Sequence, residues 1–520
     1  MRGNIAGARC DGARRRPVDR ATRGTVRVPG ALLAPRRRTS RASRRFSSVA
    51  AQPNPPMTDR RTPEQLLAQE PLRAVARLAA PTTLVMLIAA ISNVLYTYYV
   101  SRLGADAIAA VSLVFPIAMV AMTAMGGGIG GGVSSVIARS LGARRAATAT
   151  AAAEHGFLLA FSIGIGFAAL ILLGARHVLG WMGGQGDVLA SAVVFAEVLF
   201  GGAIITFTVG MLDSVLRGEG NVRVPAIWST VSLCMQVVLT PLFMFGLDLG
   251  LRGAAFATLV SQLLASLPRA WFLLGGNGAI RPRILPRRVE LEPLRAILRI
   301  GIPASLSTTI NYVGIMVLTG VVARLGTPDL AAYGLGTRLD FLLLSFAFGV
   351  SAAVLTLVGM ASGAGRPELA GRYVRAACSL IVGLLIVAGA LLWWRPSRWL
   401  GIFTDDPGIL AVGTTYFRII GPSYPFVGLS MVLAFAFQGL GRATPPLVVM
   451  AVRVPIVLAV ALWCVRAGLG EAGVFATIAA GNVLASVVMA LLLVRELRRR
   501  GHPAQPRSAP ATHGAAREGD

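Results

Sequence analysis

Long apolar runs separated by short polar hinges dominate the chain from about residue 78 onward. A helix needs roughly 20 apolar residues to cross a hydrocarbon core of about 30 Å, so each run predicts one membrane-spanning helix. The predicted spans number twelve and lie near residues 78–101, 108–138, 156–176, 188–216, 224–247, 251–275, 297–324, 330–360, 373–395, 409–439, 445–467 and 471–494. We therefore predict an all-α membrane protein with twelve transmembrane helices.

The second half of the chain repeats the pattern of the first half after about 220 residues. Residues 253–259 (GAAFATL) return as residues 472–478 (AGVFATI), and residues 217–221 (RGEGN) return as residues 438–442 (QGLGR). Six spans per half mean that both halves enter the membrane from the same side. The pattern predicts two six-helix bundles related by a pseudo-twofold axis along the membrane normal, as in many secondary transporters.

The polar segments between and around the spans predict five regions. A disordered, arginine-rich segment is expected at residues 1–70, an N-lobe at 71–276, a connecting loop at 277–296, a C-lobe at 297–497 and a disordered tail at 498–520. The first 56 residues have the composition of a transit peptide, and the alternative is that translation starts at Met57.

Arginine is unevenly distributed among the short loops. Alternate loops and the tail carry clusters such as Arg139, Arg144 and Arg145, whereas the opposite loops carry single arginines beside acids. The excess of positive charge on cytoplasmic loops places both termini in the cytoplasm. Several spans also contain proline, which favours bending helices; these residues are Pro81, Pro116, Pro241, Pro303, Pro422, Pro425 and Pro455.

Composition narrows the class of protein further. Mean hydropathy is +0.67, and 14% of residues are charged, against about a quarter in soluble proteins. The net charge of +27 lies in the N-terminal segment and the loops, so nucleic acid is not an expected partner. The four cysteines and four histidines are scattered, which predicts no disulfide framework and no metal site.

Several motifs, repeated in order in both halves, resemble the multidrug and toxic compound extrusion (MATE) family, within the multidrug/oligosaccharidyl-lipid/polysaccharide exporter superfamily. The resemblance covers roughly residues 70–497 and rests on residues 100–104 (VSRLG), 109–113 (AAVSL), 115–116 (FP), 239–243 (LTPLF), 253–258 (GAAFAT), 359–365 (GMASGAG), 422–428 (PSYPFVG) and 438–442 (QGLGR). It implies two six-helix bundles that export organic cations or other amphiphiles in exchange for Na⁺ or H⁺.

The chain departs from the family pattern where a first-lobe cation site is expected. Tyr96 stands where many bacterial relatives have Asp, and Gln236 and Thr240 replace the usual Asn and Asp of the fifth span, while Thr258 of the sixth span is kept. A hard cation prefers carboxylate or carbonyl oxygens. The first-lobe cation site therefore lacks charged ligands, although Gln236 and Thr258 stay candidates for coupling.

Two acids lie inside apolar runs, and an ionisable residue at bilayer depth is a functional candidate by default. Asp340, in the eighth span, is a candidate for cation or proton coupling, and the alternative is a structural ion pair with Arg338 or Arg418. Its counterpart in the first half, near Ala118, is apolar. Asp213, in the fourth span, is a second candidate for coupling, and a pair with Arg217 four residues later is the competing interpretation.

Uncharged polar residues in the spans could line a substrate cavity or simply join helices by hydrogen bonds. The candidates for the cavity are Tyr96, Asn93, Asn311, Tyr312 and Tyr416. The glycine run at residues 126–132 lacks the Gly-Lys-Ser/Thr ending of a phosphate loop and lies inside a span, so it predicts close helix packing or a hinge.

These patterns together predict a transporter and not an enzyme, because no nucleotide-binding motif or catalytic cluster is visible. The expected function is a monomeric secondary antiporter in the bacterial inner membrane. It would export a small amphiphilic or cationic substrate, with H⁺ or Na⁺ as coupling ion and no cofactor. The alternatives are a flippase for lipid-linked oligosaccharides and a membrane assembly protein without transport activity.

Overall fold

The computed structural model describes residues 63–501, and within that range every regular element is helical. Eleven helices are long and apolar enough to cross a membrane. A twelfth span is formed by α6 (Gly186–Gly201) and α7 (Ala203–Gly218), two helices that meet at an angle of 47°. The prediction of an all-α protein with twelve spans is confirmed.

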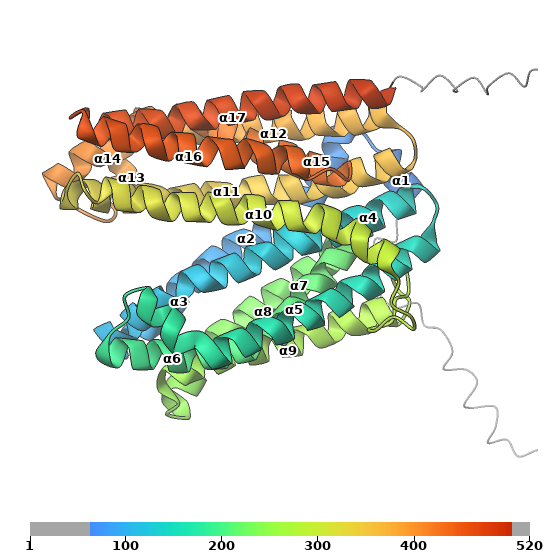
Figure 1. Cartoon of the computed structure of the whole chain (residues 1–520), viewed down its shortest axis with the longest axis horizontal. Coiled ribbons are helices and arrows are strands. Elements are labelled where there is room, and N and C mark those ends of the chain that lie inside the picture. Colours follow the sequence, from blue (N-terminus) through green and yellow to red (C-terminus); the bar gives the residue numbers. More distant parts are fainter. Residues whose placement is uncertain (1–62, 502–520) are drawn as a thin grey trace, which may run out of the picture. The chain divides into compact units, whose positions relative to one another are not determined.

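The helices of the first half follow one another with short connections and gather in one group in Figure 1. They are α2 (Pro71–Ser101), α3 (Ala105–Thr123), the π-helix η1 (Ala124–Ile129), α4 (Gly130–Gly142), α5 (Ala146–Trp181), α6, α7, α8 (Arg223–Pro241), the π-helix η2 (Leu242–Gly246) and α9 (Gly250–Leu274). The helix η1 joins α3 to α4, so these three elements form the second span.

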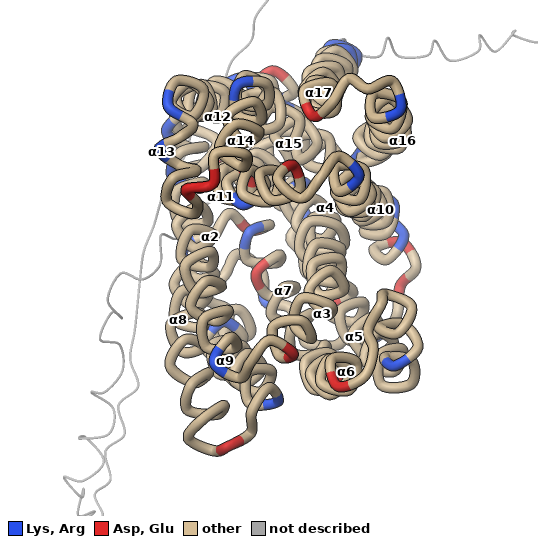
Figure 2. The backbone as a smooth tube through the Cα atoms, turned by 90° about the vertical axis from the view of Figure 1, so that its left-hand side faces the viewer, with Lys and Arg blue, Asp and Glu red and all other residues tan. Residues whose placement is uncertain are grey.

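The second half repeats this order. Its elements are α10 (Leu291–Val322), α11 (Thr327–Gly363), α12 (Pro367–Trp394), the short α13 (Pro396–Leu400), α14 (Pro407–Ile420), the 3₁₀ turn η3 (Gly421–Ser423), α15 (Tyr424–Gly439), α16 (Thr444–Arg466) and α17 (Gly470–Gly501). Most positions along the backbone are uncharged (Figure 2), as expected for helices that face lipid.

Three of the predicted boundaries differ from the structure. The short helix α1 (Pro63–Leu67) lies within the segment predicted to be disordered, because Leu66 and Leu67 are buried against the second half. Helix α10 begins at Leu291, inside the predicted connecting loop, and α17 extends to Gly501, inside the predicted tail. Met57 and the remainder of both terminal segments lie outside the described residues.

Helix α2 belongs to both lobes, although the sequence assigns it to the N-lobe alone. Its first turns bury Ala74, Val75 and Leu78 in the apolar core of the second half. Its last turn buries Val100 in a core of the first half. The first span therefore joins the two bundles along its length.

Breaks in the helices occur at matching places in the two halves. The fourth span bends between α6 and α7 at Gly202, and the tenth span is interrupted by η3, which contains Pro422. In the second span, the predicted hinge or close packing coincides with the π-helix η1 and the glycines that follow it. An added Cβ at Gly132 would lie 2.8 Å from the carbonyl oxygen of Ile297 in α10, so close packing of helices explains this glycine.

The two halves contact each other through reciprocal hydrogen bonds. Ser135 of α4 donates to the carbonyl oxygen of Gln438, and Thr356 of α11 donates to the carbonyl oxygen of Arg217 at 2.9 Å. Ser135 and Thr356 are repeat counterparts, as are Arg217 and Gln438, so each bond is the symmetry mate of the other. These bonds are direct structural evidence for the predicted pseudo-twofold axis.

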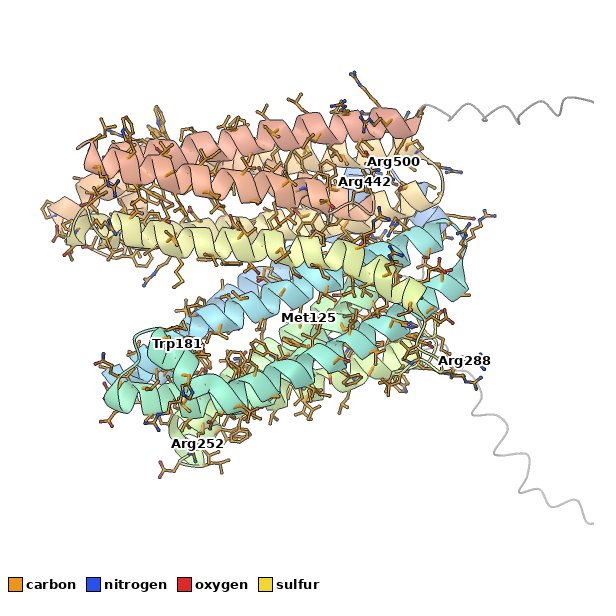
Figure 3. The ribbon with its side chains drawn as sticks, viewed as in Figure 1. Met125, Trp181, Arg252, Arg288, Arg442 and Arg500 are labelled. Carbon is orange, nitrogen blue, oxygen red and sulfur yellow. The ribbon has the colours of Figure 1, made fainter. Side chains whose placement is uncertain are left out.

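Two glycines let α4 and α11 approach each other in the same reciprocal manner. An added Cβ at Gly142 would overlap the backbone of Met360, and one at Gly363 would overlap the backbone of Arg139. These contacts lie beside the loops that follow α4 and α11. We call this side of the molecule the arginine-rich end; Figure 3 shows Arg288, Arg442 and Arg500 there, with Trp181 and Arg252 at the opposite end.

Candidate functional site

Asp340 lies in the middle of α11 and is held there by a tyrosine of another helix. The hydroxyl of Tyr416, in α14, donates a hydrogen bond of 2.7 Å to Asp340 Oδ2. Asp340 Oδ1 is buried with no hydrogen-bond partner within 3.5 Å, and the hydroxyl of Tyr424, in α15, also interacts with the carboxylate. Among the described residues no arginine lies within 4.0 Å of this carboxylate. The predicted alternative of an ion pair with Arg338 or Arg418 is therefore wrong.

Aromatic packing fixes the position of Tyr416. Its ring lies edge-on to the ring of Phe475, with 5.1 Å between centroids, and Phe475 stacks on Tyr333 at 6.5 Å. Gly336, one turn before Asp340 on α11, leaves room for the Tyr416 ring, since an added Cβ would overlap it. Packing of α11, α14 and α17 thus directs the hydroxyl of Tyr416 toward the carboxylate.

Asp340 faces a cavity of about 180 Å³ inside the second bundle. The cavity lies between α10, α11, α12, α14, α15, α16 and α17, and most of its lining is apolar. Its polar lining residues are Asn311, Tyr333, Thr337, Asp340, Tyr416, Tyr424, Arg453 and Asn482. We call this space the C-lobe cavity.

Arg453 is the basic residue of the C-lobe cavity, and the sequence analysis missed it. Its Nη2 donates to Oδ1 of Asn482, whose Nδ2 donates to Oγ of Ser423 at 3.2 Å. Arg453 Nε is buried without a hydrogen-bond partner. The signal was present, because Arg453 interrupts the apolar run of the eleventh span and so meets the criterion that singled out Asp340.

Two of the predicted cavity residues line the C-lobe cavity and three do not. Asn311 and Tyr416 line it. Tyr312, the neighbour of Asn311 on α10, is half-buried elsewhere. On α2, Asn93 is exposed and Tyr96 packs beside the core of the first half.

The polar residues of spans five and six meet in the first lobe. Gln236 Nε2 donates to Thr258 Oγ1 at 2.9 Å, and Thr240 Oγ1 donates to the carbonyl oxygen of Gln236 at 2.6 Å. Thr258 Oγ1 in turn donates to the carbonyl oxygen of Ala254 at 3.0 Å. These three side chains contribute amide and hydroxyl groups but no carboxylate, so they offer a cation only weak ligands.

Asp213 is engaged in a buried ion pair that the sequence did not predict. Its Oδ1 lies 3.3 Å from Nε of Arg269, in α9, and Ser229 donates to its Oδ2 at 3.4 Å. Arg217, the predicted partner, instead donates to Oγ of Ser214 at 3.3 Å. Arg269 is only 1% exposed, so its charge depends on Asp213 for compensation. This geometry favours a structural role for Asp213.

Comparison with known proteins identifies the family. The MatE family model matches residues 81–242 and again residues 303–463, once in each half of the chain. The chain belongs to the MatE family. The two matches have the same spacing as the internal repeat, so they confirm both the resemblance seen in the sequence and the duplication.

Several curated relatives of this MatE protein are bacterial transporters. A FAD transporter of Shewanella oneidensis is 26% identical over 371 residues, which cover 70% of this chain and 81% of that protein. The multidrug export protein MepA of Staphylococcus aureus is 25% identical over 438 residues, which cover 82% and 94%. A MatE protein is a multi-pass membrane transporter and not an enzyme.

Solved structures share the same fold. A MOP superfamily transporter from Pyrococcus furiosus has a TM-score of 0.79 and 26% identity, and the match covers 84% of this chain and 98% of that one. A MATE protein crystallised in its bent conformation has a TM-score of 0.80 and 27% identity, with coverage of 85% and 98%. The arrangement of two six-helix lobes is therefore that of MATE transporters of known structure.

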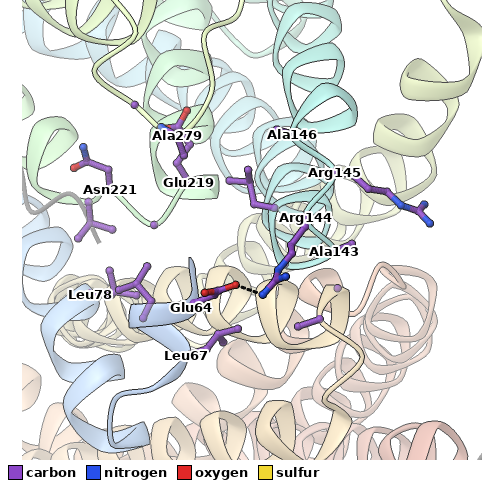
Figure 4. Close-up of a pocket in the computed structure, with 18 of the residues that line it drawn as sticks. Glu64, Leu67, Leu78, Ala143, Arg144, Arg145, Ala146, Glu219, Asn221 and Ala279 are labelled. Carbon is purple, nitrogen blue, oxygen red and sulfur yellow. Dashed lines mark hydrogen bonds and ion pairs between the residues drawn. The ribbon is translucent and has the colours of Figure 1, made fainter. Parts of the chain in front are cut away.

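A second, larger cavity of this MatE protein lies at the arginine-rich end. It has a volume of about 1210 Å³ and is lined by α1 and by the loops after α4, α7, α9 and α11. Glu64 of α1 forms an ion pair with Arg144, and Glu219 lies beside Ala279 (Figure 4). The backbone N–H of Ala279 donates to Glu219 Oε2 at 3.0 Å, whereas Glu219 Oε1 has no hydrogen-bond partner. Burial raises the pKa of Glu219 to about 7.

Proposed function

We propose that this MatE protein is a secondary antiporter that exports amphiphilic or cationic compounds in exchange for protons. Asp340 carries the proposal. It is a carboxylate inside the membrane that has no basic partner within 4.0 Å in the described part of the chain, and one of its oxygens is buried without a hydrogen bond. Such a group can bind either a proton or a cationic ligand, but not both.

Competition between the proton and the cationic substrate for Asp340 would couple proton entry to substrate export. In the state open to the cytoplasm, the ionised carboxylate binds the cationic substrate. In the state open to the other side, a proton takes its place and the substrate leaves. Exchange of one proton for one monovalent cation moves no net charge, so the proton concentration gradient drives the cycle toward export and supplies about 1.4 kcal/mol per pH unit.

A proton is a better candidate than Na⁺ for the coupling ion. Among the described residues, Asp340 is the only carboxylate that lines the C-lobe cavity, and the polar cluster of Gln236, Thr240 and Thr258 in the first lobe contains none. A hard metal cation takes several oxygen ligands in a defined geometry, whereas a proton needs a single basic oxygen. Proton coupling through Asp340 requires no further residue.

A multidrug-exporting relative and the charge distribution also support export of small amphiphiles. MepA of Staphylococcus aureus is a multidrug export protein. A flippase for lipid-linked oligosaccharides, the alternative from the sequence, would need a strongly cationic cavity to hold the diphosphate. The C-lobe cavity contains one arginine and one aspartate among its lining residues, which favours a small substrate.

We further propose that the protein acts as a monomer in the bacterial inner membrane, with both termini in the cytoplasm. The arginine clusters of alternate loops support this orientation by the positive-inside rule. The arginine-rich end would then face the cytoplasm.

Dye efflux from proteoliposomes tests the role of Asp340. We expect wild-type protein to expel rhodamine 123, a cationic dye, when a proton gradient is imposed, and not when a Na⁺ gradient is imposed alone. Asp340→Asn keeps the hydrogen bond from Tyr416 but cannot ionise, so proton-driven efflux should fall to the level of protein-free liposomes.

The control is Asp329→Asn, which removes an acid from the first turn of the same helix, outside the cavity. It should transport like the wild type. Undiminished proton-driven efflux by Asp340→Asn, at equal protein incorporation, would contradict the proposed coupling.

A further inference from the structure

The C-lobe cavity carries opposite charges on two of its walls. Asp340 lies on α11 and Arg453 on α16, and no nitrogen of Arg453 lies within 4.0 Å of an oxygen of Asp340. Each group also has one buried polar atom without a hydrogen bond, Oδ1 of Asp340 and Nε of Arg453. The two charges thus line one space without neutralising each other directly.

Arg453 has no anionic partner among the described residues. Its Nη2 donates to the amide oxygen of Asn482, and its Nη1 lies 3.8 Å from the sulfur of Met450, which is a weak acceptor. A guanidinium group does not lose its proton in a protein, so the charge persists at membrane depth. Isolated charges in this environment are costly, and they typically mark sites for an ion or a substrate.

The shape of the guanidinium favours a particular class of ligand. Arginine presents planar, diverging N–H groups that match the two oxygens of a carboxylate or a phosphate. The buried Nε–H of Arg453 has no hydrogen-bond partner, and an anionic group of a ligand would satisfy it.

The size of the cavity limits which part of a ligand it can hold. A volume of about 180 Å³ corresponds to roughly six water molecules at about 30 Å³ each. That space accommodates the charged groups of a ligand, and the rest of a drug-sized molecule would project out of it. The apolar remainder of the lining, including Leu343, Val454 and Ile478, suits the hydrocarbon part next to these charged groups.

We propose that the C-lobe cavity binds the head of a zwitterionic amphiphile, with its cationic group against Asp340 and its carboxylate against Arg453. This inference rests on the proposed antiport function and narrows its substrate class. Protonation of Asp340 would release the cationic group, as the antiport cycle requires. Arg453 would add selectivity, because a substrate without an anionic group leaves the guanidinium without a counter-charge.

Two dyes that differ in one group test the inference. Rhodamine 110 has a cationic ring system and a free carboxylate, and rhodamine 123 is its methyl ester. Fluorescence polarisation with the purified full chain in detergent gives the affinity for each dye. Wild-type protein should bind the free acid at least about tenfold more tightly, since a charge-assisted hydrogen bond contributes a factor of this order.

Arg453→Gln should weaken binding of the free acid by about tenfold and leave binding of the ester within about twofold. Arg466→Gln is the matched control, because it removes an exposed arginine from the last turn of the same helix; it should bind both dyes like the wild type. Arg453→Lys keeps the charge but lacks the planar fork, so it should retain a reduced preference for the acid. If Arg453→Gln does not fold, the inference is tested by the wild type and Arg453→Lys alone. The ratio of their affinities for the free acid and the ester should be lower in Arg453→Lys.

Two results would overturn the inference. One is equal binding of the two dyes by wild-type protein. The other is an equal loss of affinity for both dyes in Arg453→Gln, which would indicate that Arg453 acts through packing or as a counter-ion of Asp340. In either case, proton-driven efflux of rhodamine 123 would still support the proposed antiport function. Failure of the wild type to expel either dye in a proton gradient would instead contradict the antiport function itself.

Discussion

Side chains of the first half hold the backbone of the connection between the lobes. The N–H group of Ala279 donates to Glu219, and that of Glu290 donates to Nε2 of His155 at 2.9 Å. Nδ1 of His155 bonds to the carbonyl oxygen of Ala151, so the ring is fixed between two backbone groups. Glu219 and His155 therefore each hold one backbone N–H group of the segment that connects the lobes.

Stability should decrease as the pH rises through the titration range of Glu219. Its pKa is raised from 4.5 to about 7, mainly because burial disfavours the charged form, and the hydrogen bond from Ala279 opposes this rise. The folded state therefore retains a proton that the unfolded state loses between these two values. The resulting stabilisation is fully present below pH 4.5, is lost progressively up to about pH 7, and is on the order of 3 kcal/mol.

Thermal unfolding in detergent at a series of pH values measures this effect. The apparent Tm of the wild type should fall between pH 5 and pH 7.5, whereas Glu219→Gln, which cannot ionise, should show a smaller fall. Glu64→Gln removes an exposed acid from the lining of the same cavity and should keep the wild-type slope. An unchanged slope in Glu219→Gln would exclude this residue as the cause.

At this scale the sequence identified two acids inside the membrane spans but not their partners. Asp340 is identifiable because a charge interrupts an apolar run, and its proximity to Tyr416 depends on how α11 and α14 pack. For Asp213, spacing along one helix suggested Arg217, but the true partner Arg269 comes from α9. Contacts between helices have no signature in the local sequence, so pairs of this kind were missed.

At the scale of single elements, α4 and α11 depend on glycine for their contact. Gly142 and Gly363 are the points at which the two backbones meet. Small residues allow helices in a membrane to pack closely, and any side chain there must displace a neighbouring backbone. The position of these glycines therefore determines the distance between the lobes at the arginine-rich end.

Gly142→Ala should destabilise the protein by about 1–3 kcal/mol, because the added methyl group would overlap the backbone of Met360. Gly166→Ala is the matched control, since it lies in α5 with no atom within 4 Å of the added Cβ. It should be neutral or slightly stabilising, because alanine has the higher helix propensity. Apparent Tm values in detergent compare the two, and equal effects would show that space at Gly142 is not limiting.

The existence of each membrane span could be predicted from hydropathy alone, whereas the positions at which a span bends could not. All twelve spans follow from apolar length. The bend between α6 and α7 was not predicted, because Gly201 and Gly202 continue the apolar run without a proline. Glycine permits a break but does not require one, so the bend depends on neighbouring helices.

At the scale of the whole molecule, the contact between the lobes is built twice. The bonds from Ser135 to Gln438 and from Thr356 to Arg217 are related by the pseudo-twofold axis. They lie near the arginine-rich end, where α4 and α11 also meet through their glycines. Alternating access requires these contacts to break when the protein opens at this end.

Loss of both hydrogen bonds should favour the state in which the lobes separate at the arginine-rich end. Ser135→Ala with Thr356→Val removes two bonds worth about 1 kcal/mol each, so the equilibrium should shift by roughly 30-fold. Spin labels at Arg145 and Arg366, on a cysteine-free background, report the distance between the lobes, and the population at longer distances should increase.

Each single variant should produce about half of this free-energy change, because the two bonds are equivalent by symmetry. Ser379→Ala is the control, since its hydroxyl bonds only within its own helix, to Ala376; it should leave the distance distribution unchanged. A double variant with the wild-type distribution would show that these bonds do not hold the lobes together.

The reciprocal glycines and hydrogen bonds have a consequence for how such a chain can be assembled. Each half contains both members of every reciprocal contact: a hydroxyl and the carbonyl group it needs, a glycine and the backbone it meets. Two copies of one six-helix chain would therefore pair through the same contacts, as in a homodimer with an isologous interface. Because six spans return the chain to its starting side, a single gene fusion would join two such subunits without inverting either one.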